Sequence, residues 1–223
     1  MGIHGLLPNI KSVTNRTHIR DYAGLTIGID ASCWLHKGVY SCSVELCKKI
    51  PTTKYVDYCM KNIRTLLDHN IKPYVVFDGD ALPMKKGTEN ARHANREKNF
   101  ARAVELEKNG DHHGSRQCFN KAVDVTPEMG RAFMDALEEH RIPFVVAPYE
   151  ADSQLAYLAQ SGLVQVVMTE DSDLVAYGCE RVLFKWDRDS LEGDEVHRSE
   201  LGSCEKLDLV GLDSRSILNM CIL

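Results

Sequence analysis

The sequence predicts an α/β fold built on a mostly parallel sheet flanked by helices, and three observations support this prediction. Short, continuously apolar runs recur along the 223 residues, a pattern typical of strands covered on both faces. Segments with the 3.6-residue spacing of amphipathic helices separate most of these runs. Strands and helices that alternate in this way give parallel strands joined by right-handed crossovers.

Each expected element has its own apolar pattern. The expected strands are residues 25–30, 73–78, 143–147, 164–168 and 181–185. The expected helices are residues 34–49 and 53–69 after the first strand, 127–140 before the third strand, and 151–160 between the third and fourth strands.

The stretch after the second strand departs from this alternation. Residues 84–109 and 114–123 predict two long polar helices, broken at Asn109-Gly110-Asp111. Neither has a strong apolar stripe, so we expect both to project from the body. Residues 84–121 carry nine Lys or Arg against five acids, whereas the whole chain has a net charge of −5. Such a segment is either a solvated helix face or a phosphate-binding surface beside an acidic one.

Composition excludes several classes of protein. With 43% hydrophobic and 26% charged residues, the chain is typical of a globular domain. No apolar run approaches the roughly 18 residues of a membrane span, and the first residues do not resemble a secretory signal or a myristoylation site. The eight cysteines include no C-x-x-C pair, so we expect free thiols and no structural zinc.

Carboxylates follow four successive strands of the predicted sheet. They are Asp30, Asp78, Glu150, Asp152, Asp171 and Asp173. Ligand sites of open parallel sheets lie beyond the carboxyl ends of the strands, so we expect all six to converge. Any one of them could be a helix cap. Six crowded carboxylates, however, repel one another unless a cation neutralises them.

This set of ligands indicates a particular chemistry. Oxygen ligands without His or Cys favour Mg²⁺, with Mn²⁺ as a substitute, and this number suits two ions roughly 4 Å apart. Such a site hydrolyses phosphodiesters without a covalent nucleophile. Lys85, Arg92 and Arg96 share one face of the first polar helix, which could lie over the acids and receive the scissile phosphate.

Four stretches give the chain a resemblance to the flap-endonuclease family of structure-specific 5′ nucleases. They are IDASCWLHKG (29–38), VFDG with LPMKK (76–79 and 82–86), VAPYEAD with QLAYL (146–152 and 154–158), and TEDSDL (169–174). The resemblance covers the whole chain and implies a PIN-like nuclease core with a projecting helical arch. It implies one nuclease domain, residues 1–223. Its parts are an amino-terminal nuclease region (1–99), the arch (84–124) and an internal nuclease region (138–223), incomplete at its end.

The resemblance also implies a role for each candidate residue. The six carboxylates match the metal ligands of the family. Lys85 and Arg92 match catalytic arch residues that engage the scissile phosphate. Gly2 and His36 match positions that approach the DNA, with the imidazole stacking on a base. Together with Arg96, these residues form the expected DNA-binding set.

The activity implied is that of a Mg²⁺-dependent 5′–3′ exodeoxyribonuclease that also cuts flaps. Its substrates would be DNA with 5′ ends, nicks, gaps or flaps. We expect a nuclear protein of mismatch repair and recombination, with repair proteins as partners and with neither a membrane nor a small-molecule cofactor.

Two other functions remain open. A PIN-like ribonuclease would share the acidic site but would not need the long excursion after the second strand. A non-catalytic module would bind DNA or a protein partner without cutting. The family carries a seventh metal-binding Asp and a helix-two-turn-helix after the position that matches Leu223. The sequence therefore predicts a truncated chain with impaired cleavage.

Overall fold

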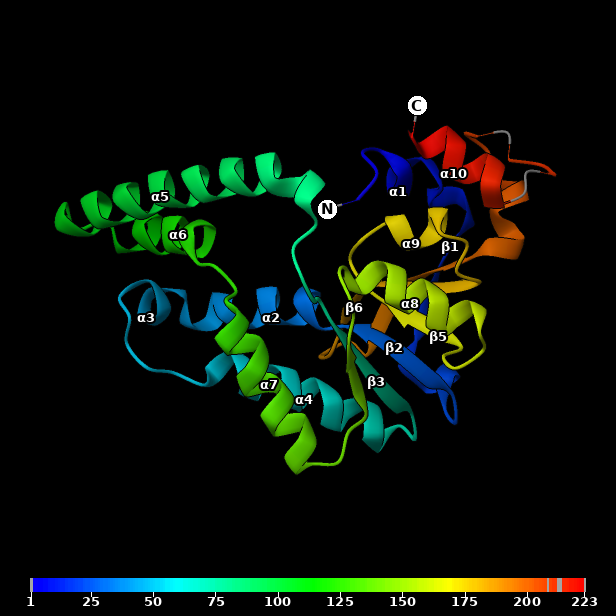
Figure 1. The fold of residues 1–223 in the computed structure, drawn as a ribbon, viewed down its shortest axis with the longest axis horizontal. Coiled ribbons are helices and arrows are strands. Elements are labelled where there is room, and N and C mark those ends of the chain that lie inside the picture. Colours follow the sequence, from blue (N-terminus) through cyan, green and yellow to red (C-terminus); the bar gives the residue numbers. More distant parts are fainter. Residues whose placement is uncertain (1, 208, 212–213, 223) are drawn as a thin grey trace.

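A central mixed sheet organises the molecule (Figure 1). The computed structural model describes residues 2–207, 209–211 and 214–222, and the side chains of all of these except residues 86, 214 and 220–222. Within this part of the chain, seven strands are ordered β1-β7-β6-β5-β2-β3-β4. Five of them run parallel and confirm the predicted strands: β2 (Thr26–Asp30), β3 (Lys72–Phe77), β4 (Phe144–Val146), β5 (Val166–Met168) and β6 (Arg181–Asp187).

Two further strands, which the sequence did not predict, extend one side of the sheet. β1 (Thr14–His18) pairs antiparallel with β7 (Glu192–His197), and β7 pairs antiparallel with β6. β1 is the edge strand and has no fully buried residue. β1 lies at the edge and needs little apolar sequence, and β7 has Val196 as its one large apolar residue, so neither segment shows the apolar run of a buried strand.

Helices cover both faces of the sheet. α2 (Ala31–Val39), α4 (Lys54–Asp68) and α7 (Pro127–Glu139) pack on one face (Figure 1). The other face is covered by α1 (Leu6–Asn9), α8 (Ala151–Gln160), α9 (Asp173–Ala176) and α10 (Ser214–Ile222). The two hydrophobic clusters are separated by the alternation of side chains along each strand.

The predicted helix over residues 34–49 is wrong as a single element. The chain leaves α2 at Val39, makes a 3₁₀ turn at Tyr40–Cys42 and continues as α3 (Ser43–Cys47). The Ser41 hydroxyl donates a hydrogen bond to the Gly38 carbonyl (2.8 Å), which competes with the helical pattern. The apolar period alone does not reveal this local competition.

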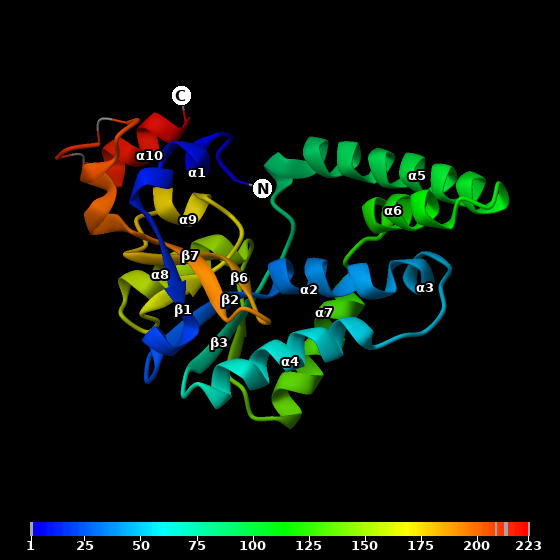
Figure 2. The same ribbon diagram turned by 180° about the vertical axis from the view of Figure 1, so that it is seen from behind.

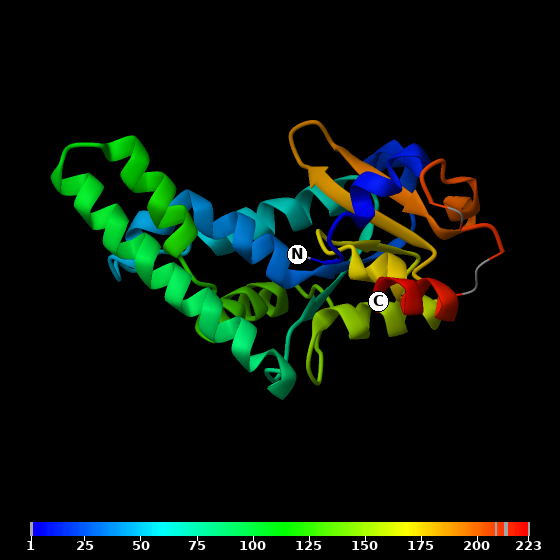
Figure 3. The ribbon, with the colours of Figure 1, turned by 90° about the horizontal axis from the view of Figure 1, so that it is seen from above.

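α5 (Lys86–Lys108) and α6 (His112–Ala122) project from the body as a helical hairpin (Figures 1 and 3), as predicted. Ala103, Ser115 and Phe119 are buried within it, and the Ser115 hydroxyl donates to the Ala103 carbonyl (2.9 Å). Asp111 caps α6 by accepting from the Gly114 amide (2.8 Å). α5 is long but polar, and no helix in the described residues has the length and apolar character to cross a membrane.

The thiols are unpaired wherever the structure describes them. Cys33, Cys42, Cys47, Cys59, Cys118, Cys179 and Cys204 are free. The prediction for Cys221 falls on a side chain outside the described residues. Burial is the main reason that the pKa of Cys33 and that of Cys59 are raised.

Replacement of Phe133 by Ala should strongly destabilise the fold. Phe133 is fully buried and packs edge-to-face against Phe77, with 5.5 Å between ring centroids. We expect Phe133→Ala to lower the free energy of unfolding by about 3–5 kcal/mol, measured by urea denaturation. Phe100→Ala is the matched control because Phe100 is 41% exposed, and it should cost clearly less. Equal losses would contradict this assignment of the core.

Candidate metal centre

The six predicted carboxylates lie just beyond the carboxyl ends of four parallel strands. Asp30 ends β2 and caps α2, and Asp78 follows β3. Glu150 and Asp152 begin α8 after β4, whereas Asp171 and Asp173 follow β5. Asp152 interacts electrostatically with Asp30, Asp78, Asp171 and Asp173, so the structure brings these residues together as predicted.

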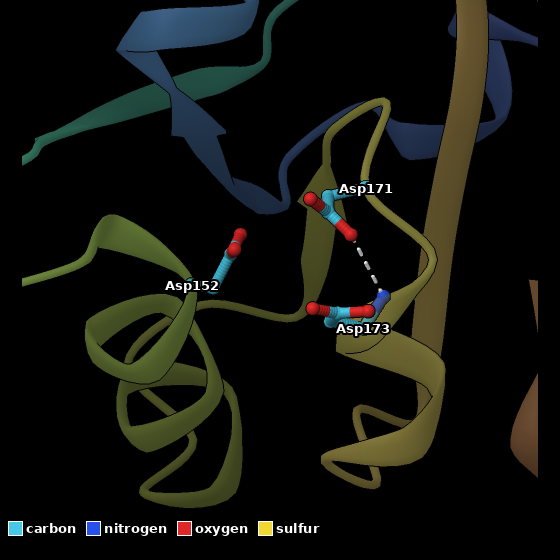
Figure 4. Close-up of side chains that lie close together, drawn as sticks. All are labelled: Asp152, Asp171 and Asp173. Carbon is cyan, nitrogen blue, oxygen red and sulfur yellow. Dashed lines mark hydrogen bonds between the residues drawn. The ribbon is translucent and has the colours of Figure 1, made fainter. Parts of the chain in front are cut away.

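Three of these carboxylates form the closest group. One oxygen from each of Asp152, Asp171 and Asp173 lies within 4.8 Å of the others (Figure 4). The Asp173 amide donates to Asp171 Oδ1 (3.1 Å). Asp152 Oδ1 is buried and has no hydrogen-bond partner among the described residues. Buried carboxylate oxygens normally have a partner, so this orphaned atom fits a cation ligand.

The crowding shifts the protonation of the cluster. Burial, followed by the charges of Asp30, Asp171, Asp173 and Asp78, raises the pKa of Asp152 to about 8. Burial and Asp171 raise the pKa of Asp173, and burial raises that of Asp30. A divalent cation favours the charged carboxylates and would oppose all three shifts.

Close backbone packing places the α8 carboxylates beside Asp78. The Ala151 amide donates to Asp78 Oδ1 (2.8 Å), and the Ser32 hydroxyl donates to Oδ2 (2.6 Å). The Gly79 amide donates to the Tyr149 carbonyl (2.6 Å). A Cβ at Gly79 would lie 1.9 Å from the Ala147 carbonyl oxygen, so only glycine permits this approach.

Two neighbours that the sequence analysis missed position Asp30. Cys33 Sγ donates to Asp30 Oδ2 (2.8 Å), and the Thr169 hydroxyl donates to the same oxygen (3.2 Å). Asp30 is also the N-cap of α2, and its Oδ1 accepts from the Cys33 amide (3.3 Å). An Asp directly before the first helical residue, three residues before the amide that it caps, is the sequence signal for this cap.

A lysine–glutamate ion pair that the sequence analysis also missed lies beside the loop that carries Asp171. The Lys37 amine and the Glu170 carboxylate are 2.5 Å apart, and Glu170 directly precedes Asp171 in the sequence. Burial, followed by Asp173 and Asp152, raises the pKa of Tyr177, which places this phenol near the carboxylates. No motif in the sequence links these residues, because tertiary packing alone brings them together.

The basic residues of the arch do not share one location. Lys85 is the N-cap of α5 and forms an ion pair with Glu150. Its hydrogen bond with Glu150 raises the pKa of Lys85, so this amine is cationic beside the carboxylates. Arg92 pairs with Glu89 (2.6 Å), and Arg96 pairs with Asp124 (3.0 Å). The structure therefore brings Lys85 to the acidic cluster and places the two arginines further along the arch.

His36 lies on α2 and interacts electrostatically with Arg92 and Arg96 of the arch. Burial lowers the pKa of His36, Asp124 opposes this shift, and Arg92 and Arg96 add to it. The ring is therefore neutral at pH 7, which suits stacking better than binding through charge.

Gly2 lies against the loop that carries Asp171. Its φ is 102°, and a Cβ there would come within 2.4 Å of both Asp171 Oδ1 and Ser172 Oγ. The Ile3 amide donates to Ser172 Oγ (2.8 Å), which holds the first residues beside the carboxylates. Glycine is required at this position for both conformation and space.

A mostly parallel sheet, carboxylates beyond its carboxyl ends and a helical arch define the PIN-like nuclease class. Residues 1–99 match the XPG N-terminal domain, and residues 141–223 match the XPG I-region. The chain belongs to the XPG and flap-endonuclease family.

The chain is similar, over most or all of its length, to relatives whose names state an activity. It is 44% identical to Exonuclease 1 of Arabidopsis thaliana and 42% identical to Exonuclease 1 of Danio rerio, each over all 223 residues. It is 42% identical over 185 residues, 83% of the chain, to Exodeoxyribonuclease 1 of Saccharomyces cerevisiae. The matches cover 30%, 27% and 26% of these relatives, so the chain spans less than a third of their length.

Solved structures confirm the predicted fold class. The catalytic core of Rad2 in complex with DNA substrate aligns with a TM-score of 0.72 at 19% identity, covering 99% of this chain and 59% of that one. Flap endonuclease-1 from Methanococcus jannaschii aligns with a TM-score of 0.65 at 22% identity, covering 99% and 69%.

Removal of the Asp152 charge should stabilise the metal-free protein. The folded pKa of about 8 lies above the ordinary value of about 4. Asp152 therefore lowers the free energy of unfolding as the pH rises from about 4 to 8. We expect Asp152→Asn to raise the Tm in EDTA at pH 8, by about 2–4 °C for each kcal/mol gained.

The same variant should lose the stabilisation conferred by Mg²⁺. Thermal unfolding from pH 5 to 8, with and without Mg²⁺, measures both effects. Asp80→Asn is the control because it removes the charge of an exposed Asp on the loop that follows β3. If Asp152→Asn has a lower Tm than the native chain in EDTA at pH 8, the repulsion argument is wrong.

Proposed function

We propose that this chain is the catalytic region of a divalent-metal-dependent 5′ nuclease that cuts DNA. The observation that carries the proposal is the acidic cluster, in which Asp152 has a raised pKa and a buried oxygen without a partner. The relatives named Exonuclease 1 support the activity. Two structures of the same fold also support it: the catalytic core of Rad2 with DNA substrate, and GEN1 with product DNA and a Mg²⁺ ion.

The residues present fit two ions, Mg²⁺ or Mn²⁺ in its place. Asp78, Glu150 and Asp152 would hold one ion and Asp152, Asp171 and Asp173 the other, with the charge of Asp30 behind them. When bound, the ions supply the Lewis acidity with which water hydrolyses a phosphodiester. Hydrogen bonds from Ser32, Thr169 and backbone amides fix the carboxylates before substrate arrives.

The basic residues bind and orient the substrate in this proposal. The ion pair with Glu150 holds Lys85 beside the cluster. When substrate binds, the Lys85 amine can leave the Glu150 carboxylate and bind the scissile phosphate, so its charge is neutralised both before and after binding. Arg92, further along α5, binds the same phosphate group. Neutral His36 stacks on a base, while Arg96 and Gly2 contact the DNA near the junction.

The proposed substrates are DNA with 5′ ends, nicks, gaps or flaps, cut as a 5′–3′ exonuclease and as a flap endonuclease. The α5–α6 hairpin favours this function over a ribonuclease with the same acids, because a compact ribonuclease needs no such excursion. We further propose a nuclear role in DNA repair, including mismatch repair and recombination, with repair proteins as partners.

A nuclease assay tests this function. The chain is assayed alone and joined to the segment that follows the matched region in the Arabidopsis relative. The substrates are recessed-end and 5′-flap DNA, in Mg²⁺ and in EDTA. We expect Mg²⁺-dependent release of nucleotides, abolished by Asp173→Ala with no loss of Tm because one repelling charge is gone. Asp57→Ala, at an exposed position on α4, is the control. Absence of cleavage in both forms would refute the function, and near-normal cleavage by Asp173→Ala would refute the metal assignment.

Loss of Lys85 and Arg92 should affect the reaction more than binding. Both groups meet charge that develops on the phosphate, so we expect the double Ala variant to lower kcat about 100-fold or more. The Kd for DNA should rise less than about tenfold. Lys98→Ala with Arg102→Ala removes matched exposed charges from α5 as the control. Equal losses in kcat and affinity, with a salt slope reduced by about two, would make both residues ordinary phosphate contacts.

A further inference from the structure

Two side chains connect Asp30, at the end of β2, to the loop that follows β5, residues 169–172. They are Cys33 on α2, the helix that continues from β2 (Figure 2), and Thr169, the first residue after β5. Both donate to the same oxygen of Asp30: the distances to Oδ2 are 2.8 Å from Cys33 Sγ and 3.2 Å from Thr169 Oγ1. The two donor atoms are 3.7 Å apart, so they approach this oxygen side by side.

Each of these side chains also accepts a hydrogen bond from a backbone amide of the loop. The Asp171 amide donates to Thr169 Oγ1 (3.1 Å), and the Glu170 amide donates to Cys33 Sγ (3.4 Å). Two consecutive amides are therefore linked, each through one side chain, to one carboxylate oxygen. We call these links, Asp171–Thr169–Asp30 and Glu170–Cys33–Asp30, the two braces.

The chemistry of the groups fixes the direction of both braces. An ionised carboxylate only accepts and an amide N–H only donates, so the hydroxyl and the thiol each receive from the loop and donate to Asp30. Thr169 is 3% exposed and Asp30 is 6% exposed, so solvent has little access to compete for these bonds. The Thr169 amide donates to the Leu183 carbonyl of β6 (3.2 Å), which ties the brace to the sheet.

The braces divide the two oxygens of Asp30 between two tasks. A carboxylate oxygen has about two lone-pair positions, and Oδ2 uses both on Cys33 and Thr169. Oδ1 accepts one hydrogen bond, from the Cys33 amide (3.3 Å), and keeps the other position. Asp30 can therefore act on a cation only through Oδ1, whereas Oδ2 anchors the loop.

We propose that Thr169 and Cys33 are positioning residues, whose braces hold the loop after β5 at a fixed distance from Asp30. This inference rests on the proposed function, in which Asp171 of that loop and Asp173 just after it hold one ion. Movement of the loop would change the separation of the two ions, and a displacement of about 1 Å costs on the order of a hundredfold in rate. Groups that orient metal ligands in this way typically contribute about 10–100-fold in metal affinity or activity.

A Mg²⁺ titration followed by thermal unfolding tests the proposal without any cleavage step. Thr169→Val keeps the shape of the side chain and removes the hydroxyl, so both hydrogen bonds of its brace are lost. We expect the Mg²⁺ concentration that gives half of the maximal rise in Tm to increase about tenfold or more. Thr169→Ser keeps the hydroxyl and should stay within about threefold of the native chain. Equal Mg²⁺ responses of Thr169→Val and the native chain would overturn the proposal.

A second threonine provides the matched control. The Thr17 hydroxyl on β1 donates to Glu195 Oε2 (3.2 Å), and Glu195 is a buried carboxylate that does not belong to the acidic cluster. Thr17→Val therefore removes a comparable hydrogen bond and should lower the Tm in EDTA while leaving the Mg²⁺ midpoint unchanged. If Thr17→Val raised the Mg²⁺ midpoint as much as Thr169→Val, general destabilisation would be the cause and the positioning role would be wrong.

Amide hydrogen exchange in EDTA locates the effect. The peptide that contains Glu170 and Asp171 should exchange faster in Thr169→Val, because the Asp171 amide loses its acceptor. Cys33→Ala should have the same effect through the other amide, and Cys33→Ser, which keeps a donor and an acceptor, should restore slow exchange. Circular dichroism checks the fold, and Cys33→Ala provides the test if Thr169→Val does not fold. Unchanged exchange in the folded variants would show that the braces do not hold the loop and would overturn the proposal.

The titration also separates this inference from the proposed function. Absence of any Tm response of the native chain to Mg²⁺ would refute the metal assignment, and the positioning role with it. A normal response of the native chain that Thr169→Val and Cys33→Ala share would refute the positioning role alone, whatever the result of the nuclease assay.

Discussion

Repulsion among the carboxylates around Asp152 is the constraint on which the rest of the site depends. Burial and four neighbouring acids raise the pKa of Asp152, so without a counter-charge the fold must hold these groups together against their own electrostatics. Hydrogen bonds keep the carboxylates in place. Ser32 and the first amide of α8 donate to Asp78, and Cys33 and Thr169 donate to Asp30. Hydrophobic clusters on both faces of the sheet stabilise the strands that carry the acids. The fold can therefore position a charge cluster that would not assemble alone.

α2 connects the acidic cluster, the arch and a cavity beside the β6–β7 turn. Its N-cap is Asp30, so the helix begins in the acidic cluster. His36 faces the arginines of the arch, while Trp34 and Lys37 face the cavity beside the β6–β7 turn. The helix is buried along Trp34, Leu35 and Val39, which makes it a rigid connection rather than a mobile one. Both faces of α2 are therefore rigidly connected to Asp30, a candidate metal ligand.

The sequence predicts those parts of the fold and of the site that depend on a repeated local pattern of residues. Apolar runs predicted the five parallel strands, and their terminal acids predicted the candidate metal centre, because parallel topology brings strand ends to one edge. β1 and β7 lack such runs, and the break in the predicted helix at Ser41 depends on one hydroxyl. Lys85, Arg92 and Arg96 share a helical spacing, yet Lys85 caps α5 and pairs with Glu150, whereas Arg96 pairs with Asp124. Contacts between distant segments decide these cases, and no local pattern encodes them.

Buried polar atoms without partners have different meanings in different surroundings. Asp152 Oδ1 lies among other carboxylates, so its surroundings favour a cation. Asn62 Oδ1, Trp186 Nε1 and Arg188 Nη1 belong to residues that line a cavity, but each of these atoms is itself inaccessible, so they do not define a ligand. Tyr22 Oη also makes no regular hydrogen bond, but it lies near the Glu195 carboxylate, burial together with this charge raises the pKa of Tyr22, and its ring is fully buried in the core. A ligand needs space as well as an unmade hydrogen bond. An orphaned atom therefore indicates a candidate ligand site only where like charges gather around it, as they do at Asp152.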